Sequence, residues 1–116
     1  MQKLTHPPDE FVCDIRPDRR RVIVPLAGEL DLRVAGEAGA AVDELLDAGF
    51  RYVVVDLREL SFLDSSGAHI LGAAWRSAER QQRAMSLIRG PQNVQRVLQL
   101  TRAESLFAFV AAGEDD

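Results

Sequence analysis

The chain has 116 residues, of which 47% are hydrophobic and 28% charged, so its composition predicts one folded domain with a single core. A net charge of −4 gives no general attraction to phosphate backbones, and no apolar run would span a bilayer, so neither nucleic acid nor a membrane is an expected partner. The single cysteine, Cys13, excludes an internal disulfide and a zinc-type cysteine pair, and no metal or other cofactor is expected. The polar N-terminus lacks the apolar segment of a secretory signal, which predicts a cytoplasmic location.

Both ends of the chain differ in character from the region between them. Residues 1–10 are predicted to be a flexible lead-in and residues 113–116, GEDD, a solvated acidic tail, which leaves the domain at residues 11–112. Within it, FVCDI (11–15) and RVIVPLAG (21–28) are strand-like runs separated by RPDRR, and this arrangement predicts a β-hairpin. Pro25 has no backbone N–H to donate, which predicts either an edge position or a bulge in the second strand.

Hydrophobic residues then recur with a helical period. Residues 33–47 carry one apolar stripe and are followed by Gly49, which predicts an amphipathic helix with a glycine stop. YVVVDL (52–57) is a continuous β-branched run, typical of a central strand, and RELSFL (58–63) follows it. A second apolar stripe from residue 66 to about residue 82 predicts a second helix.

The remaining elements complete an alternating pattern. MSLI (85–88) is a short predicted strand, and GPQNVQRVLQL (90–100) is a predicted helix with Pro91 near its first position. SLFAFV (105–110) is either a last strand or a docked apolar segment. The order β-β-α-β-α-β-α contains two crossovers and predicts an α/β fold, a small mixed sheet of four to five strands with helices packed on it.

The segment DSSG (64–67) stands where a strand gives way to a helix, and three interpretations of its serines are open. Asp64 or either serine would be a favoured N-cap. A catalytic nucleophile would need a base, yet only His69 follows on the same helix, without an orienting acid or a G-x-S-x-G elbow. In the third interpretation a kinase phosphorylates one serine, because a phosphate is well accommodated at a helix N-terminus and its added charge would expel a partner.

Three stretches of the chain resemble the STAS-domain family and, within it, the bacterial anti-sigma-factor antagonists. They are LAGELDL (26–32), VVVDLRELSFLDSSGAHIL (53–71) and NVQRVLQLTRAESLF (93–107), and the resemblance covers about residues 11–110. It implies that Ser65 is phosphorylated by an anti-sigma factor that is also a serine kinase of the histidine-kinase-like ATPase type. The unphosphorylated antagonist then binds this anti-sigma factor and releases a sigma factor, and a phosphoserine phosphatase restores it.

The same resemblance assigns roles to the residues around Ser65. Asp31 is expected beside Ser65, assisting recognition or phosphorylation, and Asp64, Ser66 and Gly67 are expected to form the environment of the phosphorylation site and the docking loop. It implies a non-enzymatic protein with no catalytic residue, monomeric outside its complexes. Relatives continue into a further helix after the segment that matches LFAFV, so a shortened C-terminus is expected.

Two alternatives remain from the sequence. The first is a STAS protein that serves another sensory or stress-signalling complex, since not all members of the family act on sigma regulators. The second and more remote alternative is a small Ser-dependent hydrolase.

Overall fold

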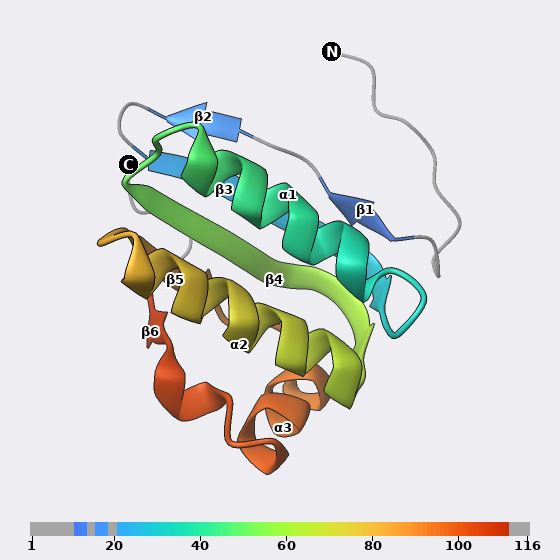
Figure 1. Ribbon diagram of the computed structural model, residues 1–116. Helices are drawn as coiled ribbons and strands as arrows, with labels where there is room; N and C mark the ends of the chain where they lie inside the picture. Colours follow the sequence, from blue (N-terminus) through green and yellow to red (C-terminus); the bar gives the residue numbers. More distant parts are fainter. Residues whose placement is uncertain (1–10, 14–15, 19–20, 112–116) are drawn as a thin grey trace.

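The computed structural model describes residues 11–13, 16–18 and 21–111 and has the alternating order of elements that the sequence predicts (Figure 1). The predicted lead-in and acidic tail lie outside these residues. The elements are β1 (Val12–Cys13), β2 (Arg16–Asp18), β3 (Arg21–Leu30), α1 (Ala35–Asp47), β4 (Tyr52–Leu63), α2 (Ser65–Arg80), β5 (Ala84–Ile88), α3 (Gln92–Leu100), the 3-10 turn η1 (Glu104–Leu106) and β6 (Ala108–Phe109).

The sheet is mixed, with the strand order β1-β3-β4-β5-β6. The strands β3, β4, β5 and β6 are parallel, whereas β1 and β2 both run antiparallel to β3. Because β1 and β2 pair with successive parts of β3, they share one edge of the sheet, so the six described strands form a sheet five strands wide. The predicted mixed α/β sheet is therefore confirmed. The strand β4 lies at the centre, as its β-branched run predicts.

The hairpin differs from its prediction in one detail. Part of the expected turn RPDRR is itself a strand, because residues 16–18 pair with residues 23–21 of β3. Pro25 lies in β3, which has neighbours on both sides, and the register with β4 shifts between Pro25 and Ala27. Of the two positions expected for this proline, the structure therefore shows the bulge.

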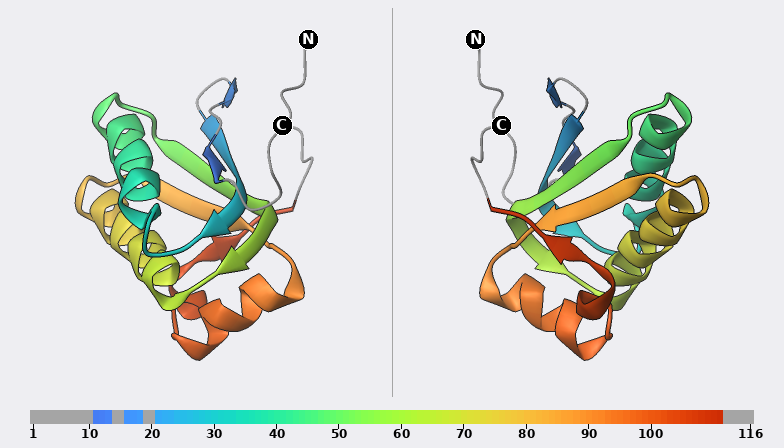
Figure 2. Two further views of the ribbon diagram at one scale, coloured as in Figure 1. Left: turned by 90° about the vertical axis from the view of Figure 1, so that its right-hand side faces the viewer. Right: turned by 90° about the vertical axis from the view of Figure 1, so that its left-hand side faces the viewer.

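The helices α1 and α2 cover the same face of the sheet, and α3 lies below the sheet in the views of Figure 2. The two crossovers place α1 and α2 side by side because the strand order β3, β4, β5 proceeds in one direction across the sheet. The helix α1 ends as predicted, with Gly49 at φ +102° in the left-handed region that favours glycine. No helix among the described residues is long and apolar enough to cross a membrane.

The core between the sheet and these helices is aliphatic. Val53, Val55 and Leu57 of β4 are fully buried, and so are Leu46 of α1 and Leu98 of α3. Burial of one such side chain contributes about 1.5–3 kcal/mol. The core thus fixes the positions at which β3 and β4 end, and the candidate site lies at these ends.

Candidate functional site

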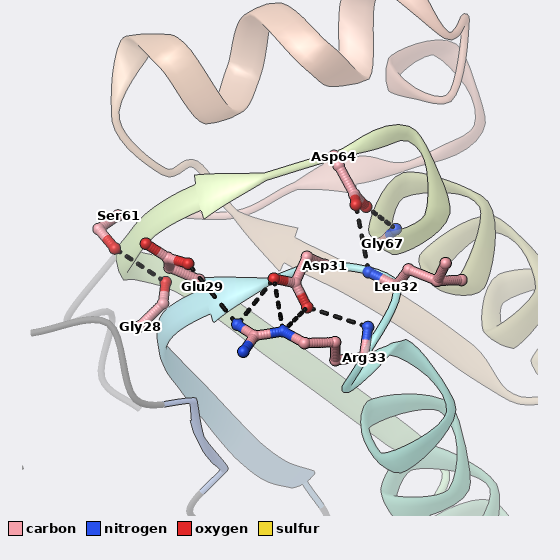
Figure 3. A network of polar contacts seen from close by, with 8 residues as sticks. All are labelled: Gly28, Glu29, Asp31, Leu32, Arg33, Ser61, Asp64 and Gly67. Atoms are coloured by element: carbon pink, nitrogen blue, oxygen red, sulfur yellow. Dashed lines mark hydrogen bonds and ion pairs between the residues drawn. The ribbon is translucent and has the colours of Figure 1, made fainter. Parts of the chain in front are cut away.

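The site is built at the carboxyl ends of two neighbouring parallel strands. Leu30 of β3 pairs with Leu63 of β4, so the residues that follow them, Asp31 and Asp64, leave the sheet at the same edge. Two hydrogen bonds join the two segments. The Asp64 N–H donates to the Leu30 carbonyl at 3.3 Å. The Leu32 N–H donates to Asp64 Oδ2 at 3.1 Å (Figure 3).

Asp64 is the N-cap of α2, which settles the first interpretation of DSSG. Its backbone is extended, and its Oδ1 accepts a hydrogen bond from the Gly67 N–H at 2.9 Å. One carboxylate oxygen therefore holds the first turn of α2 while the other holds the turn before α1. The hydroxyls of Ser65 and Ser66 make no hydrogen bond within the described part of the chain, so neither serine is needed as a cap.

Gly67 allows the first turn of α2 to press against the ends of both strands. A Cβ atom at this position would lie 2.6 Å from Leu63 Cδ1 and 2.7 Å from the Leu30 carbonyl oxygen. Both distances are shorter than real Cβ contacts, and the carbonyl belongs to the backbone, which cannot rotate away. The absence of a side chain is therefore a packing requirement at residue 67.

Ser65 is exposed and lies between two open hollows in the surface. The first hollow, of about 530 Å³, lies between α1 and α2 and is lined mainly by Leu32, Ala35, Gly36, Ser65, Ser66 and Ile70. Leu32 stands out here because it is 75% exposed, although a hydrogen bond to Asp64 fixes its backbone. Leu32 could not be recognised from the sequence, since one apolar residue in a turn carries no signal by itself.

The second hollow, of about 420 Å³, lies between α2 and the segment formed by the end of α3 and η1. Its lining includes Ser65, His69, Gly72, Arg76, Arg102 and Leu106. His69 lines both hollows and makes no hydrogen bond to Ser65 among the described residues. Those residues also contain no cluster of three or more side chains that would hold a metal ion.

Asp31 belongs to the same edge but directs its carboxylate to Arg33. Its Oδ1 accepts from the Arg33 N–H at 3.0 Å, and its Oδ2 accepts from Arg33 Nη2 at 2.9 Å (Figure 3). These hydrogen bonds, chiefly those from the guanidinium group, lower the pKa of Asp31 below its ordinary value. The structure thus brings residues 64–67 together as one turn and links Asp31 to them through the neighbouring residue, Leu32.

Comparison with known proteins identifies the fold and its family. The family model of the STAS domain matches residues 13–115, so the chain belongs to the STAS-domain family. An anti-sigma factor antagonist from Mycobacterium paratuberculosis has a similar structure, with a TM-score of 0.82 and 21% identity over 96% of this chain and 94% of that one.

Two structures of SpoIIAA are also similar. The anti-sigma factor antagonist SpoIIAA in its unphosphorylated form gives a TM-score of 0.74 at 23% identity, over 90% of this chain and 91% of that one. Bacillus SpoIIAA in its phosphorylated form gives a TM-score of 0.68 at 22% identity, over 90% of this chain and 95% of that one. At these identities the likeness shows a shared fold.

The packing of α2 predicts opposite effects for two glycine substitutions. Gly67→Ala should lower the free energy of unfolding by about 1–3 kcal/mol, because the new methyl group overlaps Leu63 and the Leu30 carbonyl. Gly72→Ala places its Cβ 3.6 Å from Leu106 Cδ1, an ordinary contact, and should raise the free energy of unfolding by up to about 1 kcal/mol through helix propensity. Urea unfolding followed by far-UV circular dichroism measures both values, and equal effects would contradict this packing.

The hydrogen bonds of Asp31 predict a pH dependence. The folded-state pKa of Asp31 is lowered, so its contacts with Arg33 stabilise the fold above about pH 4, and this stabilisation is lost as the pH falls through the lowered pKa. Arg33→Gln should return the pKa of Asp31 toward its ordinary value, whereas Arg51→Gln should leave it unchanged. An NMR titration of the Asp31 carboxyl carbon tests this, and an unchanged pKa in Arg33→Gln would refute the assignment of its cause.

Proposed function

We propose that this protein is an anti-sigma-factor antagonist whose binding to its partner is switched by phosphorylation of Ser65. The observation that carries the proposal is the state of the Ser65 hydroxyl, which is exposed at the start of α2 and free of capping because Asp64 caps the helix. A kinase would reach this hydroxyl without unfolding any part of the site. The fold shared with an anti-sigma factor antagonist supports the same class of function.

Electrostatics favour phosphorylation of Ser65 as a switch. A phosphate on Ser65 would stand at the N-terminus of the 16-residue helix α2, where the helix dipole favours negative charge, so the fold would tolerate it. It would add a charge of about −1.5 to −2 beside Asp64 and Asp31. A partner docked over Ser65 would then meet repulsion and the cost of desolvating the phosphate, and it would dissociate.

The partners follow from this proposal. The unphosphorylated protein binds an anti-sigma factor that is also a serine kinase with a histidine-kinase-like ATPase fold, and this binding releases a sigma factor and so regulates transcription in a stress response. A phosphoserine phosphatase reverses the modification. The chemistry belongs to these partners, so the protein itself is a non-enzymatic cytoplasmic regulator, monomeric outside its complexes.

The neighbouring residues would shape the surface that the kinase recognises. Asp31 contributes negative charge in recognition or phosphorylation, while Ser66, which is half-buried, and Gly67 fix the path of the docking turn. The exposed Leu32 would enter an apolar site on the partner, because it is a large apolar side chain on the hollow beside Ser65 and is 75% exposed.

Substitutions at Ser65 test the switch. Wild type, Ser65→Ala, Ser65→Asp and the control Ser66→Ala serve as baits for affinity capture from a lysate of the source organism, followed by mass spectrometry of the bound proteins and of Ser65. Ser65→Ala and Ser66→Ala should retain a kinase-like ATPase, and Ser65→Asp should lose it. Equal recovery on Ser65→Ala and Ser65→Asp would refute the switch, and an ATPase absent from every bait would favour a STAS protein of another signalling complex.

A substitution at Leu32 tests the apolar contact. Leu32→Ala should weaken binding of the captured ATPase by roughly tenfold, because it removes an apolar anchor from the interface. Tyr52→Ala is the control, since Tyr52 is also exposed, at 51%, but begins β4 at the end opposite Ser65. Isothermal titration calorimetry gives both affinities, and equal affinities for the two variants would remove Leu32 from the interface.

A further inference from the structure

The second hollow beside Ser65 has the form of a groove that follows α2. Ser65, His69, Gly72 and Arg76 are spaced by three or four residues, so they lie along one face of the helix. At a rise of 1.5 Å per residue, Ser65 and Arg76 stand about 16 Å apart along the helix axis. The end of α3 and η1 form the opposite wall and contribute Arg102. We call this hollow the arginine groove.

The charge of the arginine groove differs from that of the rest of the chain. The protein has a net charge of −4, yet among the described residues no aspartate or glutamate lines this groove. Arg76 and Arg102 are exposed, and their guanidinium groups take part in no ion pair or hydrogen bond within the described residues. By contrast, Arg33, Arg58 and Arg89 are each paired with a carboxylate. Two guanidinium groups in the groove are therefore available for an acidic ligand.

The floor of the arginine groove is small and apolar. Ala68, Ala103 and Leu106 contribute to it, and Gly72 provides no side chain at its middle. A Cβ on Gly72 would find ordinary space, 3.6 Å from Leu106 Cδ1, so packing does not demand a glycine there. An extended peptide would lay small apolar side chains on this floor while its carboxylates meet the arginines.

We propose that the arginine groove binds an acidic peptide segment of the protein that phosphorylates Ser65, an inference that rests on the proposed function. A groove about 16 Å long exceeds what a single inorganic anion would fill. Two arginines on a chain of net negative charge are too few to attract nucleic acid. Because Ser65 forms one end of the groove, its phosphate would repel the acidic segment.

The direct test uses a synthetic probe and does not require the kinase. A hexapeptide of alternating glutamate and alanine with blocked ends is titrated into the protein, and backbone amide shifts are followed by NMR. Shifts should concentrate at residues 65–76 and 101–106, and the equivalent glutamine–alanine peptide should produce none. Shifts elsewhere, or the same affinity for both peptides, would overturn the proposal. Saturation of the same shifts by inorganic phosphate at equal concentration would reduce the groove to an anion site and also overturn it.

Two double variants test whether the arginines of the groove, rather than exposed arginines elsewhere, bind the acidic peptide. Arg76→Gln combined with Arg102→Gly should weaken binding of the acidic peptide by roughly fivefold or more, whereas Arg80→Gln combined with Arg96→Gln, two exposed arginines outside the groove, should leave it unchanged. Arg102 holds φ +64°, a backbone conformation that glycine adopts without strain, so Arg102→Gly should not unfold the protein. Equal affinities of the two double variants would refute the assignment.

The final test measures how the kinase-like ATPase recovered with Ser65→Ala binds to the groove variants. In the Ser65→Ala background, the groove double variant should weaken its binding roughly tenfold and the control double variant should not. If the ATPase binds all variants equally, the groove inference fails while the proposed function stands. If no ATPase is recovered, the proposed function fails, and the peptide titration alone decides whether the groove takes an acidic segment.

Discussion

The carboxylate of Asp64 is the interaction on which the arrangement of the site depends. Its two oxygens accept hydrogen bonds from two segments, the first turn of α2 at Gly67 and the turn before α1 at Leu32. Hydrogen bonds to a charged group contribute about 1.5–3 kcal/mol each, so the contact is strong enough to fix both turns. Because the carboxylate performs the capping, the adjacent serines keep free hydroxyls. A helix cap and an exposed serine with a free hydroxyl thus occupy neighbouring positions.

The same contact relates the two hollows beside Ser65. One lies between α1 and α2 and is apolar at its rim, where Leu32 stands, and the other lies between α2 and η1 and carries arginines. Both include Ser65 in their lining. A single added phosphate would therefore change the charge of two different surfaces at once, and a partner that used both would respond more steeply than one that used either alone.

Much of the fold could be predicted from the sequence, because long periodic segments determine it. The central strand and the first two helices follow from the β-branched run at residues 52–57 and from two amphipathic stripes. The extension of β4 to Leu63 could not be predicted in this way. Its buried residues Leu57, Leu60 and Leu63 recur every third position, which is not the period of a regular strand.

The candidate site was predictable only in part. The sequence placed DSSG at a helix start, but three adjacent residues there were all good caps. Asp64 differs from the two serines in a second hydrogen bond, from the Leu32 N–H, which lies 32 positions away in the sequence. Leu32 and Arg102 gave no signal for a related reason, since their importance comes from which segments fold beside Ser65.

The pairing of β3 with β4 determines where the two strands end, and therefore where the site lies. From the pair Pro25–Asp56 to the pair Leu30–Leu63, β3 advances by 5 residues (30 − 25) and β4 by 7 (63 − 56), the difference being divided between two register shifts. These two single-residue shifts give β4 two residues more than the stretch of β3 beside it, and they keep Leu63 opposite Leu30. Because each bulge bends its strand, the end of β4 that carries Asp64 takes its direction from these extra residues. A chain without them would keep the pairing of Leu30 with Leu63, but its straighter β4 would aim the Asp64 carboxylate differently with respect to the Leu32 N–H.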